Sequence, residues 1–370
     1  MSDIVERIPW FMPEVGEEEL KGLEHVLRIN YFNDGPVARQ LEETLADLLG
    51  VNHCVTVTSG TTAITLALMA AGIGQGDEVI VPDLTFIATA NAVTLTGATP
   101  VLVDVEPERF AIHPQAVEQA ISNRTRAIVP VDVNGRGCDY QALTALSEEH
   151  GITLISDSAE ALGSRYQGRY LGTYGTAGCF SFSANKTVSS GQGGLIATND
   201  PDLYHRIKEL KDQGRRHTGT GGDDPHPVLG FNFKYTNLQA AVALAQLQRL
   251  ESRLQGFMKR DQWYIQALSD VPGITLPSFD EPGEVRQWMD IRVPAHHRDT
   301  IIDRMEARGF GCRGFWRPLH RQKPYARPDS AYTNTIQVAA EGFWLPSSFS
   351  LTEQQAASAS AALTAIMADL

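Results

Sequence analysis

Between residues 50 and 200, short runs rich in β-branched residues alternate with segments that have the length and periodicity of helices. The strand-like runs are 53–58, 78–82, 100–104, 127–133 and 152–156, and helices are predicted over 61–71, 85–96 and 140–150. Strands separated by helices of this length predict a parallel or mostly parallel sheet that is covered by helices on both faces. On such sheets, ligands bind at the carboxyl ends of the strands.

The pattern changes after residue 200. Residues 213–227 are rich in Gly, His and Asp and show no apolar period, which is typical of a loop. Apolar residues from Leu238 to Leu254 then repeat near a 3.6-residue period and predict one long helix. Beyond it, a strand over 287–293 and helices over 299–308 and from Thr352 predict a second, α+β unit. The predicted domains are 1–236 and 237–370.

Composition excludes several classes of protein. The 31 Lys and Arg against 44 Asp and Glu give a net charge of −13, and the basic residues are scattered. Binding to nucleic acid or to an anionic membrane surface is therefore disfavoured. The longest apolar run, 64–73, is too short to cross a bilayer, which takes about 20 residues.

Cysteine usage and the N-terminus indicate the compartment. Cys54, Cys138, Cys179 and Cys312 are far apart and form no Cys-x-x-Cys pair, which disfavours a zinc ribbon or a disulfide framework. The first ten residues lack the apolar stretch of a signal peptide. We expect a cytoplasmic protein without a metal site.

The first motif is Val57-Thr-Ser-Gly-Thr-Thr-Ala63, in which a predicted strand ends in Ser-Gly and a helix starts at once. Free amides at a helix N-terminus, with hydroxyls beside them and a glycine that lets the backbone come close, can hold a phosphate. An ordinary N-cap uses the same residue types. Taken alone, this motif favours the N-cap.

The second motif places Asp157 directly after an apolar strand. A carboxylate in that position loses water and needs a cation or several hydrogen-bond donors. A structural cap of the next helix is at least as good an interpretation. A metal site fits less well, because no His or second carboxylate stands at ligand spacing.

The third motif runs from Cys179 to Gly194 and contains Lys186 after alternating aromatic and hydroxyl residues. No other Lys or Arg occurs between Arg169 and Arg206, so Lys186 does not belong to a charged surface. A lysine in a partly dry cleft can act as a nucleophile that forms a Schiff base. The alternative is a surface lysine that follows a strand.

Taken together, the three motifs favour one cofactor. Pyridoxal 5'-phosphate (PLP) has a phosphate, a ring nitrogen that must stay protonated and an aldehyde that condenses with a lysine. The phosphate turn comes first in the chain, and Asp157 precedes Lys186 by 29 residues. We therefore predict a PLP enzyme.

In this order, the motifs resemble those of the DegT/DnrJ/EryC1/StrS sugar aminotransferases, which are fold type I PLP enzymes. The resemblance covers nearly the whole chain and rests on Gly35-Pro36 and on residues 59–63, 83–91, 97–104, 157–161, 181–186 and 230–240. It implies an α/β fold in which a large domain with a mostly parallel seven-stranded sheet, flanked by helices, carries a smaller α+β C-terminal domain.

The resemblance also implies roles for residues around the cofactor ring. Lys186 would form the covalent bond to the cofactor and then move the proton as acid and base. Asp157 would bind the ring nitrogen, and Phe86 would stack on the ring. Glu160 falls where the family places a polar group near the ring hydroxyl.

Further roles concern the phosphate, the subunit interface and the substrate. The resemblance implies that Gly60, Thr61 and Ser181 bind the phosphate. Asn232 would reach the cofactor phosphate of the neighbouring subunit, which implies a homodimer with shared active sites. His320 and Lys234 would contact the substrate.

The chain departs from the family pattern at three places. Gln192 stands where many relatives have Glu, Lys234 stands where they have Arg, and Asp132-Val-Asn-Gly135 replaces a His-aromatic-Gly segment. These differences concern substrate contacts. Relatives that act as sugar 3-dehydratases carry His in place of the lysine, so Lys186 favours amino transfer.

The leading hypothesis is a transaminase that moves an amino group from L-glutamate to a keto carbon, C4, of a nucleotide-linked deoxy sugar. A sugar 3-aminotransferase or an aminocyclitol enzyme of the same family is the nearest alternative. A PLP-dependent lyase or desulfurase is another, although a desulfurase needs a reactive cysteine in a mobile loop, whereas Cys54 and Cys179 fall in predicted strands. A non-catalytic binding or regulatory protein on this fold is the rival from a different class.

Overall fold

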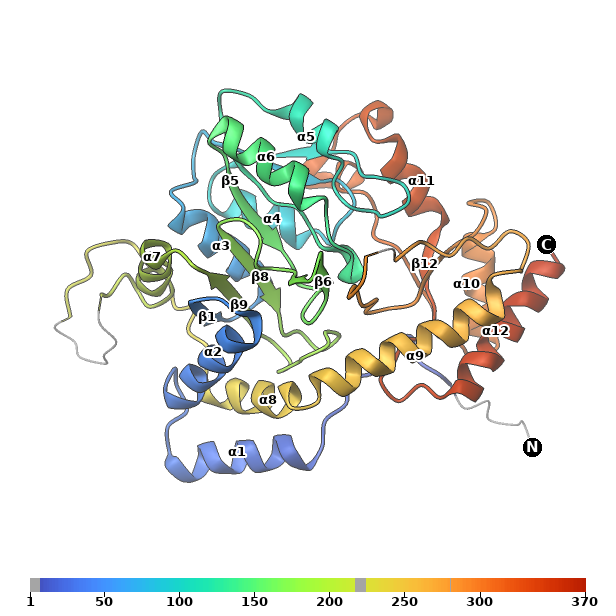
Figure 1. Cartoon of the computed structure of the whole chain (residues 1–370), viewed down its shortest axis with the longest axis horizontal. Helices are drawn as coiled ribbons and strands as arrows, with labels where there is room; N and C mark the ends of the chain where they lie inside the picture. The colour runs from blue at the N-terminus through green and yellow to red at the C-terminus, as the bar shows by residue number, and fades with distance from the viewer. Residues whose placement is uncertain (1–6, 217–223, 280) are drawn as a thin grey trace.

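The computed structural model describes residues 7–216, 224–279 and 281–370 (Figure 1). Its larger unit contains a seven-stranded sheet in the order β1-β9-β8-β5-β4-β2-β3. The strands are β1 (His53–Val57), β2 (Glu78–Pro82), β3 (Thr99–Val103), β4 (Thr125–Ile128), β5 (Thr153–Asp157), β8 (Ala177–Ser181) and β9 (Gly194–Thr198). In this sheet β9 is antiparallel to both neighbours and the other pairs are parallel. The predicted mostly parallel sheet is confirmed.

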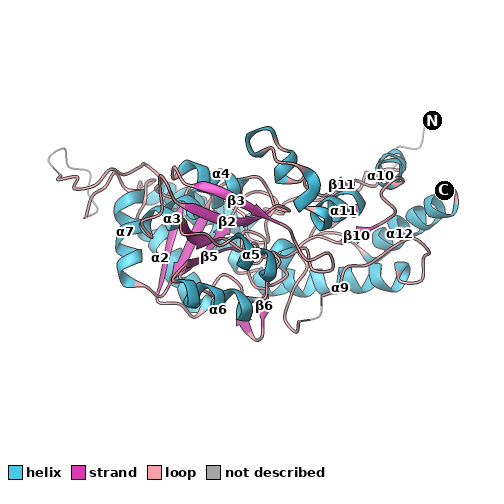
Figure 2. Ribbon diagram, turned by 90° about the horizontal axis from the view of Figure 1, so that it is seen from above, coloured by secondary structure: helices cyan, strands magenta, loops and turns pink. Residues whose placement is uncertain are grey.

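Alternating side chains of the strands enter two different cores. Val55 and Val57 pack on one face, while Cys54, the residue before Val55, packs on the other. The first face is covered by α3 (Gly60–Ala70), α4 (Ala88–Leu95) and α7 (Pro201–Lys211). The opposite face is covered by α2 (Pro36–Leu49), α5 (Pro114–Ala120), α6 (Tyr140–His150) and α8 (Asn237–Leu247). Figure 2 shows the strands between these helical layers. Both faces are therefore dry, which the near-continuous apolar strands require.

The C-terminal part forms its own core around a small antiparallel sheet in the order β10-β12-β11. Its strands are β10 (Asp290–Arg292), β11 (Arg313–Gly314) and β12 (Gly342–Trp344), and its helices are α9 (Leu250–Leu268), α10 (Arg298–Ala307), α11 (Thr333–Glu341) and α12 (Glu353–Ala368). The long helix α9 links this unit to the larger one (Figure 1). Helix α1 (Glu17–Ile29) packs on α8, and β6 (Arg165–Tyr166) and β7 (Arg169–Tyr170) form a hairpin. Short 3-10 helices lie at Val133–Gly135, Leu319–Arg321, Lys323–Tyr325 and Asp329–Ala331.

The prediction of one long helix from Leu238 to Leu254 is wrong. The N–H of Arg249 bonds the carbonyl of Gln246, three residues back, and this tight turn separates α8 from α9. Helix α8 packs on α1 and α2, whereas α9 packs on α12. The predicted domain boundary at 236 stays a prediction. It assigns α8 to the C-terminal domain, although α8 packs on α1 and α2 of the N-terminal one.

Three other predicted elements are shorter than expected. The strand expected over 127–133 ends at Ile128 as a regular element; beyond it an isolated bridge from Val131 to Asp157 continues the pairing, before the chain turns at Asn134, where φ is 56°. The helix expected from residue 85 begins at Ala88, and the strand expected over 287–293 is confined to 290–292. Of the predicted loop 213–227, residues 217–223 lie outside the described residues.

Two findings bear on membranes and thiols. Among the described helices, none has the length and apolar character that are needed to cross a bilayer. All four cysteines are free, and Cys54 and Cys179 lie in strands, as predicted. Burial raises the pKa of both thiols, which makes them poor nucleophiles.

Candidate active site

A cavity of about 490 Å³ opens at the carboxyl ends of β5 and β8, beside the start of α3. Part of its lining, here called the floor, consists of residues of the larger unit: Ser59, Gly60, Thr61, Phe86, Asp157, Glu160, Ser181 and Lys186. Another part, here called the wall, consists of Trp10, Trp288, Arg313, Trp316 and Trp344. The structure thus brings seven of the ten predicted site residues to one cavity.

Lys186 lies in the turn between β8 and β9, five residues after the last residue of β8. Its backbone N–H donates to the carbonyl of Ser183, which closes the turn. The amine Nζ is 3.2 Å from Oε1 of Glu160 and 5.1 Å from the centroid of the Trp288 ring. Only 11% of the side chain is exposed, so the amine is held in a nearly dry cleft.

Asp157 is the last residue of β5 and is buried at the base of the cavity. Its carboxylate accepts the Thr89 hydroxyl at 2.7 Å and the Ala159 N–H at 3.2 Å. Burial raises the pKa of Asp157, although these hydrogen bonds oppose the rise. Its charged form is therefore favoured by a cationic group in the cavity, such as a protonated ring nitrogen.

The start of α3 fits both interpretations of its motif. Ser59 is an N-cap, because its hydroxyl accepts the N–H of Thr62 at 3.1 Å. The first amides of a helix have no acceptor within the helix, and those of Gly60 and Thr61 belong to residues that line the cavity. A Cβ on Gly60 would lie 3.0 Å from Cβ of Ser181, so glycine lets α3 approach the end of β8 closely.

Phe86 and Glu160 complete the floor. Phe86 precedes α4 and lines the cavity with 53% of its surface exposed, which leaves an apolar ring free to stack. Glu160 is buried, and its two oxygens have different partners. Oε1 accepts from Lys186, while Oε2 accepts the backbone N–H of Asn134 at 2.9 Å.

His320 does not line the cavity. It is buried, with Nδ1 2.5 Å from Oδ2 of Asp83 and Nε2 3.0 Å from Oδ1 of Asp329. Its ring stacks on Tyr332 with 4.4 Å between the centroids. These contacts hold the imidazole between two carboxylates, so in the described structure it ties the segment after β11 to the end of β2.

Asn232 and Lys234 also lie away from the cavity of their own chain. Asn232 is exposed, and its backbone pairs with that of Asp212. The amine of Lys234 is 2.6 Å from Oδ1 of Asp212.

Sequence reasoning missed the wall. Four of the five tryptophans of the chain line this one cavity, although they are far apart in sequence. Within the described residues, the indole N–H groups of Trp10, Trp288 and Trp344 have no acceptor. The guanidinium of Arg313 lies 4.9 Å from the centroid of the Trp10 ring. No local signal in the sequence could have found this cluster, because its rings pack on one another across distant segments of the chain.

The residues present fit PLP. The cavity offers an amine for the aldehyde, a buried carboxylate for the ring nitrogen, a helix start for the phosphate and an exposed aromatic ring for stacking. Each of these four groups is on the floor.

Comparisons with known proteins agree with this geometry. The profile of the DegT/DnrJ/EryC1/StrS aminotransferase family matches residues 13–364. The chain is 39% identical over 328 residues to GDP-perosamine synthase of Caulobacter vibrioides, and the aligned region covers 85% of each protein. Among solved structures, S. venezuelae DesV in complex with a ketimine intermediate is 31% identical, with a TM-score of 0.91 over 98% of this chain and 99% of that one. The PLP form of Spr1654 from Streptococcus pneumoniae is 26% identical, with a TM-score of 0.93 over 98% and 99%. The chain therefore belongs to the DegT/DnrJ/EryC1/StrS aminotransferase family.

Proposed function

We propose that this aminotransferase uses PLP to move an amino group from L-glutamate to the C4 keto carbon of a nucleotide-linked deoxy sugar, with GDP-4-keto-6-deoxymannose as the acceptor. The observation that carries the proposal is that the amine of Lys186 and the carboxylate of Asp157 line one cavity, together with the start of α3. The similarity to a GDP-perosamine synthase supports the choice of acceptor.

PLP supplies an electron-withdrawing ring and an aldehyde that can carry the amino group. Lys186 would bind the aldehyde and then move the proton as acid and base. Glu160, 3.2 Å from the amine, holds Lys186 toward the cavity. Asp157 would keep the ring nitrogen protonated, because its buried charge needs a cation beside it.

The wall suits a sugar substrate. The indole rings that line it offer apolar contact to the carbon–hydrogen face of a sugar ring. Arg313 adds a cation at the same surface, which can pair with a phosphate or a carboxylate. Nucleotide sugars and glutamate both carry such anions.

We further propose a homodimer with shared active sites. Asn232 is exposed and lies away from the cavity of its own chain, so it is available to the cavity of a partner, whereas Lys234 would have to leave its pair with Asp212 to reach it. Mixing Lys186→Ala protein with Asn232→Ala protein tests this directly. In a shared-site dimer, the mixed species contains one site with both native residues, so activity returns. Two inactive proteins that stay inactive when refolded together would contradict it.

The proposed location is the cytoplasm, where the four free cysteines stay reduced. The reaction itself is tested by incubating the purified protein with PLP, L-glutamate and a panel of keto-sugar nucleotides. The expected result is a product of the GDP-linked 4-keto sugar in which the carbonyl oxygen is replaced by an amino group, seen by mass spectrometry and placed by NMR. If the protein instead aminates C3 of a sugar, or a cyclitol, the proposed acceptor is wrong. A protein that PLP does not colour would favour a non-catalytic role.

A further inference from the structure

Asn134 occupies a buried turn between β4 and α6 and has a left-handed backbone, with φ 56° and ψ 27°. Asn and Gly adopt this conformation more readily than other residues. At the next residue, Gly135, a Cβ would lie 2.1 Å from the carbonyl oxygen of Val285. The turn is therefore pressed against the segment that leads to β10.

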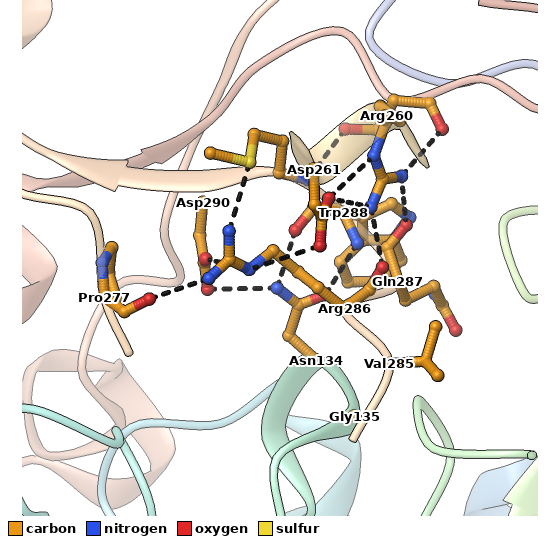
Figure 3. Close-up of polar contacts among 12 residues, drawn as sticks. Asn134, Gly135, Arg260, Asp261, Pro277, Val285, Arg286, Gln287, Trp288 and Asp290 are labelled. Atoms are coloured by element: carbon orange, nitrogen blue, oxygen red, sulfur yellow. Dashed lines mark hydrogen bonds and ion pairs between the residues drawn. The ribbon is translucent and has the colours of Figure 1, made fainter. Parts of the chain in front are cut away.

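The side-chain amide of Asn134 binds both backbone groups of Trp288 (Figure 3). Oδ1 accepts the Trp288 N–H at 2.7 Å, and Nδ2 donates to the Trp288 carbonyl at 2.7 Å. Nδ2 also donates to Oδ2 of Asp290 at 3.0 Å. The side chain of Asn134 thus bonds the backbone N–H and carbonyl of Trp288, as a neighbouring strand would, and fixes the backbone that carries the Trp288 ring.

The backbone of Asn134 fixes the other neighbour of the lysine amine. Its N–H binds Oε2 of Glu160 at 2.9 Å, which leaves Oε1 to accept from Lys186 at 3.2 Å. The ring of Trp288 is the amine's other neighbour, 5.1 Å from Nζ. Asn134 is therefore bonded both to Glu160 and to the backbone of Trp288, the two residues that contact the amine.

Gln287, the residue before Trp288, binds the chain on both sides of Lys186. Its Nε2 donates to the carbonyl of Asn185 at 3.1 Å, and its Oε1 accepts the Thr187 hydroxyl at 3.3 Å. The segment that Asn134 holds is thus also the segment that holds the lysine turn.

The carboxylate of Asp290 binds the side-chain amide of Asn134 and two buried arginines. Burial alone would raise the pKa of Asp290, but the guanidinium groups of Arg136, at 2.6 Å, and Arg286, at 3.1 Å, hold it below its usual value. The carboxylate that accepts from Asn134 is therefore a fixed anion (Figure 3).

We propose that Asn134 is a positioning residue of the aminotransferase reaction, which holds Glu160 and the Trp288 ring in place beside the lysine amine. The inference rests on the proposed function, since it concerns the same amine. Asn134 itself does not line the cavity. Its loss should therefore lower kcat and leave the KM for glutamate nearly unchanged.

The test uses Asn134→Gly, which preserves the left-handed turn and the N–H to Glu160 but removes the bonds to Trp288. We expect kcat with L-glutamate to fall about 10- to 100-fold, because small misplacements of a reacting group cost this much. A second readout is the fraction of Lys186 that borohydride traps on PLP at limiting cofactor, measured by peptide mass, which should also fall. Asn30→Gly is the matched control: Asn30 has φ 54° and is exposed at the end of α1.

A double-mutant cycle separates positioning from general destabilisation. If Asn134 acts through Trp288, Asn134→Gly combined with Trp288→Ala loses about as much kcat as Trp288→Ala alone. The inference is overturned if the kcat losses of the two single variants multiply in the double variant. It is also overturned if Asn134→Gly leaves both kcat and the trapping of PLP on Lys186 unchanged. Asn134→Asp keeps the acceptor and the turn but loses the donor to the Trp288 carbonyl and to Asp290, and it repeats the test if the glycine variant does not fold. Wild-type protein that traps no PLP would instead contradict the proposed function.

Discussion

The floor and the wall of the cavity are built in different ways. On the floor, Asp157 ends β5, Ser181 ends β8 and Gly60 begins α3, so one sheet places them together. On the wall, Trp10 comes from the N-terminal segment and Trp344 from β12, more than 300 residues later. The chemistry thus depends on short motifs at strand ends, whereas the shape of the substrate pocket depends on contacts between distant segments.

The strongest test of the floor is Lys186→Ala. Loss of the general base alone costs about 10² to 10⁴ in rate, and loss of the covalent link adds to it. We expect no measurable turnover, together with some loss of thermal stability, because the buried carboxylate of Glu160 loses its cationic partner. Turnover assays and thermal melts check this, with Lys259→Ala on the exposed face of α9 as the control. Near-normal activity would remove Lys186 from the mechanism.

Asp157→Asn should have the next largest effect. The amide preserves the size of the side chain and can still accept from Thr89, but it carries no charge to keep a ring nitrogen protonated. We expect kcat to fall about 100- to 1,000-fold, as for the loss of one preorganised electrostatic group. Absorbance should show that PLP still binds. Unchanged kcat would mean that Asp157 only caps the chain after β5.

These two residues show how much could be predicted from sequence. Asp157 and Lys186 follow recognisable strands, and the resemblance to a known family added Phe86 and Glu160 to the same cavity. The wall could not be predicted, because nothing local to Trp288 shows that Asn134, 154 residues earlier, holds its backbone. The break at Arg249 was missed for a similar reason, since the apolar period continues through it while the packing partners change.

The wall has its own weak point at Asp290, which is buried with Arg136 and Arg286. Asp290→Asn leaves two buried guanidinium groups without their shared anion, and breaking a buried ion pair in this way costs about 3–5 kcal/mol. Denaturant titration should show this loss. Asp299→Asn is the control, because its pair with Arg298 is exposed and should cost far less. If the two variants were equally stable, the wall would not depend on this buried charge.

A second buried acid, Asp132, is bonded to hydroxyl groups rather than to cations, and its titration should have the smallest but most specific effect. Its carboxylate is bonded to the hydroxyls of Tyr140, at 2.8 Å, and Ser158, at 2.6 Å. Burial raises the pKa of Asp132 to about 7. In the unfolded chain the pKa is about 3.9. Between these values the native state binds a proton that the unfolded state does not, so this group makes the protein less stable as pH rises, by up to about 1.4 kcal/mol per unit.

Asp132→Asn removes this titration and keeps a side chain that can bond both hydroxyls. The melting temperature of the variant minus that of the wild type should therefore increase from pH 5 to about pH 7 and level off above it, because the wild-type carboxylate is then ionised in both states. Other titrating groups are common to both proteins and cancel in the difference. The exposed Asp299→Asn should give a flat difference over the same range. A flat line for Asp132→Asn as well would mean that Asp132 is already ionised at pH 5, and that Tyr140 and Ser158 alone stabilise its charge.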